Sequence, residues 1–244
     1  MSAVVSHPPL APRRGAARAT TWWGRAFVRA LEEAAFTERD LRLGRGLARS
    51  GSVGGISITA GRLVAAVSDP HGLFTVDARL PVLDAAAQAW LVEAVAAEAG
   101  RVGALLAGDL PHDLVEHADE GGAELLPFGS ELETTCTCEG WLDPCPHALA
   151  VLSQAAWLVD DDPLVLLHLR GLPRDDLLAR LHALTAGGSA LDPGDDDGGG
   201  GGDGGAGGDP ALETALDTAQ DAAARAARVV RLLEAGDDAI DHLL

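Results

Sequence analysis

The chain has 244 residues and a formal net charge of -19, because 37 acidic side chains outnumber 18 basic ones. This length allows one or two domains of modest size. All the basic residues are arginine, and the chain contains neither lysine nor tyrosine. The composition therefore excludes a Walker-type phosphate loop, a Schiff-base lysine and a proton relay built from tyrosine and lysine.

The three cysteines, Cys136, Cys138 and Cys145, lie within ten positions of one another. They cannot form the disulfide framework of a secreted protein, so we expect a reducing, cytoplasmic setting. The first 15 residues lack the apolar segment of a secretory signal, and no hydrophobic segment follows the paired arginines there. Polar side chains interrupt the longest apolar stretch, 147–159, so we expect no membrane span.

Residues 1–20 contain several prolines, three arginines and little apolar periodicity, which predicts a disordered basic arm. Apolar side chains then recur at helical spacing over 23–35. Thr37, with Asp40 three residues later, provides a helix cap, and the second helix is expected to reach about Arg49. An arginine-rich pair of helices is therefore predicted near the start of the chain.

Beyond residue 51 the apolar pattern changes to a period of two. Alternating runs at 56–58, 63–67 and 74–80, with turn signals between them, predict a three-stranded antiparallel meander. Helical spacing then returns at 85–100 and continues through 105–106 and 114–115. Three later segments are also expected to be helical, 145–159, 163–169 and 174–185.

The composition changes abruptly at residue 186. The segment 186–209 consists largely of glycine and aspartate, and it cannot bury enough apolar surface to offset chain entropy, which predicts a disordered linker. In the tail, 210–244, apolar residues recur at alternating spacings of four and three, which predicts a helix. This helix either docks on the main domain or forms a coiled-coil seam, which the alanines in the pattern would weaken.

All the cysteines lie in one motif with the pattern Cys-x-Cys, six residues, Cys-x-His, formed by Cys136, Cys138, Cys145 and His147. Three soft thiolates and one imidazole are the ligand set of a closed, tetrahedral zinc site. Both side chains of a Cys-x-Cys pair point to the same side of an extended strand. Pro146 suits the first position of a helix, which places Cys145 at the helix cap, and the negative charge of the site favours a helix N-terminus beside it.

This motif, on a short hairpin that leads into an apolar helix, resembles the SWIM zinc finger, which is named from Swi/Snf-type helicases and MuDR transposases. The motif resemblance covers about residues 131–158. The flanking Trp22-Trp23-Gly24, the strand meander and the helices of 164–184 are similar to bacterial SWIM proteins of high-GC actinobacteria. The resemblance implies zinc binding, a role in binding DNA or proteins, and association with a Swi/Snf-type helicase.

Two other interpretations of the motif remain open. The three cysteines could be buried apolar thiols and His147 an ordinary helix residue. Alternatively, His147 could activate Cys145 or Cys138 as the nucleophile of an enzyme, although no oxyanion-hole motif or third member accompanies them. Trp141, between the ligand pairs, is expected to pack as a lid over the metal, the alternative being a platform on which a base stacks.

The charges along the chain separate into two regions. Between 102 and 169 there are 13 acidic residues and no arginine, which disfavours phosphate contact at the zinc face. Residues 1–50 instead carry nine arginines and four acids. Arg42, Arg45 and Arg49 share one helical face and are the candidates for contact with DNA. The alternative is that this basic face pairs with the acidic domain of the same chain.

These observations predict an α+β protein in which a small antiparallel strand meander and a zinc hairpin pack with several helices. The expected domains are the arm 1–20, the SWIM-containing domain 21–185, the linker 186–209 and the tail 210–244. We expect a non-enzymatic protein whose structural zinc presents a surface for a protein partner in a helicase or DNA-transaction complex. The alternatives are a DNA-binding accessory factor that uses the arginine-rich helices, and then a Cys/His enzyme.

Overall fold

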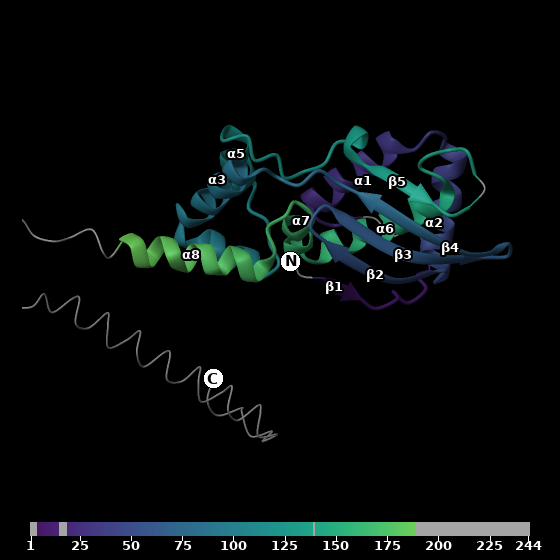
Figure 1. Cartoon of the computed structure of the whole chain (residues 1–244), viewed down its shortest axis with the longest axis horizontal. Helices are drawn as coiled ribbons and strands as arrows, with labels where there is room; N and C mark the ends of the chain where they lie inside the picture. Colours follow the sequence, from purple (N-terminus) through teal and green to yellow (C-terminus); the bar gives the residue numbers. More distant parts are fainter. Residues whose placement is uncertain (1–3, 15–18, 139, 189–244) are drawn as a thin grey trace, which may run out of the picture. The chain divides into compact units, whose positions relative to one another are not determined.

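The computed structural model of the chain describes residues 4–14, 19–138 and 140–188 (Figure 1). Its strands form one antiparallel sheet in the order β1-β2-β3-β4-β5. The strands are β1 (Val5–His7), β2 (Val53–Thr59), β3 (Arg62–Asp69), β4 (Gly72–Arg79) and β5 (Glu133–Cys136). The predicted three-stranded meander forms the centre of this sheet and is confirmed.

The alternation of side chains determines which face of the sheet is buried. Leu63, Ala65 and Val67 of β3 are buried, as are Val76 and Ala78 of β4, and the residues between them are partly exposed. Because successive side chains of a strand point to opposite faces, one face of the sheet packs on the helices and the other is in contact with solvent.

The helices form two groups. They are α1 (Trp22–Ala34), α2 (Glu38–Ser50), α3 (Ala85–Ala96), α4 (Ala99–Leu106), α5 (His112–Glu120), α6 (Pro146–Asp161), α7 (Pro163–Leu169) and α8 (Arg174–Gly188). Helix α6 is buried along most of its length and contacts α1, α2 and strands β2 to β5, and Figure 1 shows α1, α2 and α6 gathered on one side of the sheet. Helices α3, α4, α5 and α8 form the second group, which contacts the first group through α7 and through His112 of α5, which packs against the Trp22 ring of α1.

Side-chain caps explain where the first two helices begin. At the start of α1, the Thr21 hydroxyl oxygen accepts from the Gly24 N–H at 3.0 Å, and the Asp160 carboxylate, near the end of α6, accepts from the Thr21 N–H at 2.9 Å. Burial raises the pKa of Asp160, but its hydrogen bonds outweigh burial and hold the pKa below its usual range. At the start of α2, the Thr37 hydroxyl oxygen accepts from the Asp40 N–H at 3.1 Å, as the sequence predicts.

The contact between α2 and α6 depends on a glycine. A Cβ atom at Gly44 would lie 2.6 Å from the Cβ of Leu149 and 2.9 Å from the backbone oxygen of Pro146. The same interface contains a buried hydrogen bond, in which Gln154 Nε2 donates to the Ala48 carbonyl at 2.8 Å. The two helices therefore approach more closely than any side chain at position 44 would allow.

A buried arginine directly after α7 joins the segment that leaves β4 to the segment that leads into β5. Arg170 is 2% exposed and donates to the carbonyl oxygens of Leu125 at 3.0 Å and Pro81 at 2.9 Å. It also donates to the Glu131 carboxylate at 3.0 Å. Burial raises the pKa of Glu131, but the hydrogen bond from Arg170 and the backbone N–H of Phe128 outweigh burial, so the pKa lies below its usual range.

The prediction of a disordered arm over 1–20 is wrong at Val5–His7, which pairs with β2. The backbone N–H of Arg13 also donates to the Arg49 carbonyl at 3.0 Å. Backbone hydrogen bonds rather than apolar burial hold this segment, since Val5 is 42% exposed. The lack of apolar periodicity in this segment therefore does not predict whether its backbone is ordered.

Two boundaries differ from the prediction. The expected helix 85–100 is divided into α3 and α4, because Glu98 has an extended backbone and the guanidinium of Arg101 donates to the Ala94 carbonyl at the end of α3. Helix α8 extends to Gly188, just inside the predicted linker. The rest of the linker 186–209 and the whole tail 210–244 lie outside the described residues.

Within the described residues, no helix combines the length and the apolar character that crossing a bilayer requires. The five-stranded antiparallel sheet and the helices that pack on it confirm the predicted α+β class.

Candidate metal centre

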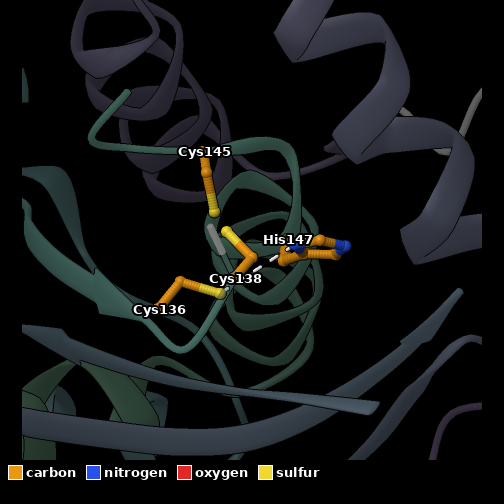
Figure 2. Close-up of side chains that lie close together, drawn as sticks. All are labelled: Cys136, Cys138, Cys145 and His147. Carbon is orange, nitrogen blue, oxygen red and sulfur yellow. Dashed lines mark hydrogen bonds between the residues drawn. The ribbon is translucent and has the colours of Figure 1, made fainter. Parts of the chain in front are cut away.

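The four residues of the Cys/His motif lie together (Figure 2). Cys136 is the last residue of β5, and Cys138 lies just beyond it. Cys145 is the N-cap residue of α6, Pro146 is in its first turn as predicted, and His147 follows. Figure 2 shows the three sulfurs and the imidazole converging from the end of a strand and the start of a helix.

The geometry of the four donors fits a zinc ion. One donor atom from each residue lies within 4.8 Å of the other three. In a tetrahedral site with Zn–S bonds of about 2.3 Å, neighbouring ligand atoms are about 3.7 Å apart, so the donors need to approach one another by only about 1 Å. Three sulfurs and one imidazole nitrogen form the soft donor set that zinc prefers, and all four positions of the tetrahedron are filled by the protein.

The ring of His147 is held in the orientation that metal binding requires. Its Nδ1 lies 3.9 Å from the Cys136 sulfur, on the side of the other ligands. Its Nε2 lies 3.0 Å from Asp69 Oδ2, and both side chains are largely buried, at 11% and 14% exposure. The Phe74 ring stacks on the imidazole with centroids 4.5 Å apart. A carboxylate on one ring nitrogen fixes the proton there and leaves the other nitrogen free for the metal.

The three thiols differ in acidity. Burial raises the pKa of Cys136 to about 12 and also raises that of Cys145. Burial acts on Cys138 too, but its interactions with His147 and with the backbone N–H of Gly140 outweigh burial and lower its pKa to about 7. Cys138 therefore supplies a thiolate near neutral pH, and binding of zinc by all three sulfurs releases protons.

Hydrogen bonds fix Thr137, between the first two ligands, and Asp143, shortly before the third, to the sheet. The backbone N–H of Thr137 donates to the Thr75 carbonyl at 3.1 Å, and the N–H of Thr75 donates to the Thr137 hydroxyl oxygen at 2.9 Å. The hydroxyl of Thr134 bonds the carboxylate of Asp143 on the far side of the loop. Both ends of the loop are therefore attached to β4 and β5.

Comparison with known proteins places the chain in a family. Residues 119–156 match the SWIM zinc finger, a match that begins earlier than the predicted 131. The chain is 32% identical over 203 residues to "Uncharacterized protein Rv2102" of Mycobacterium tuberculosis, an alignment that covers 78% of this chain and 73% of that protein. The chain belongs to this family and carries a SWIM zinc finger. No solved structure matches it.

The SWIM finger has a supporting residue that sequence reasoning missed. Asp69 is the last residue of β3, and its carboxylate accepts from the backbone N–H groups of His71 at 2.7 Å and Gly72 at 3.1 Å across the turn to β4. The hydrogen bond from His147 is the main reason why its pKa lies below the usual range. The sequence identifies Asp69 only as part of a turn between two strands. It lies 78 positions before the histidine that it orients.

The prediction that Trp141 packs as a lid over the metal is wrong. Its side chain is 88% exposed, whereas its neighbour Leu142 is partly buried and occupies the inner position of the loop. Trp141 lines a cavity of about 620 Å³ together with Phe74, and the ligands Cys138, Cys145 and His147 line the same cavity. The SWIM finger thus presents a large aromatic side chain to solvent.

The predicted arginines lie together in a second place. Arg42, Arg45 and Arg49 of α2 line one cavity together with Arg25 of α1, which the sequence pattern alone does not single out. Within the part of 1–50 that the structure describes, Arg45 forms an ion pair with Glu32 of the neighbouring helix α1. Among the described residues, no acidic side chain beyond residue 50 pairs with Arg42, Arg45 or Arg49, and the acids of 189–244 lie outside them.

Proposed function

We propose that this SWIM protein is a non-enzymatic interaction protein, in which a structural zinc ion presents a surface to a protein partner. The closed set of four protein ligands supports a structural role, because catalytic zinc sites keep one position open for water or substrate. The same ligand set uses Cys138, Cys145 and His147, the residues that a Cys/His enzyme would need as nucleophile and base.

The observation that carries this proposal is the exposure of Trp141 beside the zinc site. Phe74, which stacks on the His147 ring, and Leu142 line the same cavity as Trp141. Exposed aromatic and aliphatic side chains beside a cavity are typical of the anchors of protein interfaces, where tryptophan dominates the binding energy. Zinc would order this surface, because it holds the loop that carries Trp141 between β5 and α6.

The chemistry of the partner follows from the charge around the finger. The segment 102–169, with 13 acidic residues and no arginine, repels a phosphate backbone and attracts a basic protein surface. We propose a partner of the Swi/Snf-type helicase class within a DNA-transaction complex, in keeping with the SWIM finger.

The test is co-expression of the full chain with the Swi/Snf-type helicase of its own genome, followed by co-purification. Trp141→Ala should abolish co-purification while the chain keeps one zinc ion and an unchanged thermal melt. Phe36→Ala is the matched control, because Phe36 is also an exposed aromatic, at 70%, but lies in the turn between α1 and α2. Retention of the helicase by the Trp141 variant, or equal losses in both variants, would reject this surface.

A second measurement tests the metal itself. Cys138→Ser should lose zinc and, with it, the partner, because structural zinc sites contribute about 10–16 kcal/mol of apparent binding energy to local folding. A purified chain without metal, whose thermal melt does not respond to a chelator, would reject the structural zinc ion. The Cys/His enzyme would then be the better interpretation of these residues.

A further inference from the structure

A second cavity lies between α1, α2 and α6 and contains none of the four zinc ligands. Its volume is about 660 Å³, within the usual range of ligand pockets. Arg25, Arg42, Arg45 and Arg49 line it, and among the described lining residues Glu32 alone is acidic. The cavity therefore concentrates positive charge in a chain whose net charge is -19.

Most of these guanidinium groups keep N–H donors free for a ligand. Arg42 and Arg25 each donate to one backbone carbonyl, at 3.3 Å and 2.8 Å, and Arg45 pairs with Glu32. Arg49 is half-buried, and its guanidinium forms no hydrogen bond or ion pair with the described residues. Since each guanidinium has five N–H donors, the group as a whole is arranged to bind an anion.

The floor of the cavity is apolar. Val28 and Leu31 of α1 and Ala156 and Trp157 of α6 line it, and the hydroxyl of Ser153 beside them donates to the Leu149 carbonyl of its own helix. The guanidinium of Arg13 lies 4.6 Å from the centre of the Trp157 ring, a cation–π contact that adds a further positive charge at this side. The cavity thus places apolar side chains directly beside a row of cations.

We propose that this cavity binds single-stranded nucleic acid, with phosphate groups on the arginines of α2 and a base against the apolar floor. A nucleotide joins a flat ring to an anion, which matches the two surfaces, and grooves that combine basic and aromatic side chains bind single strands in this way. Arg42, Arg45 and Arg49 follow one another at about 4.5 and 6 Å along the helix axis, so they form a row for successive phosphates. This inference does not depend on the function proposed for the zinc face.

Other anionic partners fit the cavity less well. A duplex keeps its bases stacked inside, so it could contact the rim arginines but would leave the apolar floor between α1 and α6 unfilled. An acidic peptide offers carboxylates to the arginines, but its flexible acidic side chains place no flat ring against Trp157. A single strand satisfies both surfaces because its bases are unstacked and free to turn inward.

The experiment uses the full, zinc-loaded chain and a fluorescein-labelled oligo-dT strand, with binding followed by fluorescence anisotropy over a range of salt concentrations. The triple variant Arg42→Gln, Arg45→Gln and Arg49→Gln should bind at least about tenfold more weakly. The slope of log affinity against log salt concentration should also become less steep by about 2, since each of the three lost phosphate contacts to a single strand contributes about 0.7.

The matched control changes three arginines from the same part of the chain that do not line the cavity, Arg14→Gln, Arg29→Gln and Arg39→Gln. It removes the same charge and should keep most of the affinity. Should the first triple variant fail to fold, Arg49→Gln alone serves in its place, because that guanidinium has no partner to lose among the described residues. Equal weakening by both triple variants would show that only net charge matters and would overturn the proposal.

Three further probes test the assignment of the ligand. An oligonucleotide with abasic sites should bind more weakly than oligo-dT, because no base fills the apolar floor. The duplex of oligo-dT with oligo-dA and a polyglutamate peptide should both bind more weakly than the single strand. Equal or tighter binding of any one of these probes, or no binding of oligo-dT at low salt, would overturn the proposal.

Discussion

Replacing Asp69 with asparagine tests how the SWIM finger holds its histidine. Asp69 Oδ2 lies 3.0 Å from His147 Nε2, while its Oδ1 accepts the backbone N–H of His71 and Gly72 in the hairpin turn. Asparagine keeps one acceptor oxygen, which the turn requires, and therefore directs an NH₂ group at the imidazole. Two donors would then face each other unless the histidine moved its proton from Nε2 to Nδ1.

That change of tautomer removes the lone pair that zinc needs. Because the contact is largely buried, at 11% and 14% exposure, water cannot readily replace the lost acceptor. Loss of a carboxylate that orients a metal-bound histidine typically lowers metal affinity 10- to 100-fold. We expect a loss of about that size for Asp69→Asn, with little change in the metal-free thermal melt, because the turn keeps its two backbone bonds.

The assay is competition for zinc between the protein and a chromophoric chelator at neutral pH. Asp113→Asn is the control, since Asp113 is also an aspartate that accepts from a side-chain N–H, that of Arg101, but it lies on α5 and contacts no zinc ligand. The control should bind zinc as the native chain does. Native zinc affinity in Asp69→Asn would refute the argument that Asp69 sets the tautomer of His147.

Two further predictions concern packing and pH. Gly44→Ala should lower the free energy of unfolding by about 2–3 kcal/mol, because the new Cβ would lie 2.6 Å from the Cβ of Leu149. The control is Gly46→Ala on the same helix, where a new Cβ meets nothing within 4 Å. This change should raise the free energy of unfolding by about 0.5–1 kcal/mol. Urea unfolding of the zinc-loaded chain measures both, and equal effects would contradict the close approach of α2 and α6. Arg170→Gln should cost about 3–5 kcal/mol, because it leaves Glu131 without its buried partner. The folded-state pKa of Glu131 is depressed, so the stability from this pair is present above the ordinary pKa of 4.5 and is lost as pH falls through the lowered value. The difference between native chain and variant in urea unfolding should therefore narrow below pH 4.5, and a difference that stays constant there would argue against a role for the Glu131 charge.

The parts of the site that the sequence could predict are those whose residues are close in the chain. Pro146 at the first turn of α6 placed Cys145 at the helix cap, and the period of two in β3 and β4 identified the buried face of the sheet. These features follow from backbone preferences and from side-chain periodicity, which act over a few residues.

The remaining parts depend on contacts between distant segments. Asp69 meets His147 and Arg170 meets Glu131 only after the sheet and α6 have packed, and no local pattern reports such pairs. Residues Val5–His7 were missed for a related reason, because an edge strand held by backbone hydrogen bonds needs no particular side chains. Trp141 was placed wrongly because loop position alone does not tell which of two neighbouring apolar residues, Trp141 or Leu142, turns inward.

Helix α6 makes the zinc finger and the arginine cavity parts of one cooperative folding unit. It begins at the metal with Cys145 and His147, provides Trp157 to the floor of the cavity two to three turns later, and ends where Asp160 caps α1. Loss of zinc frees the first turn of a helix on which both α1 and α2 rest, so the disturbance spreads to the cavity rather than stopping at the finger. Hydrogen exchange along α6 would then report metal loading at the arginine cavity as well as at the finger.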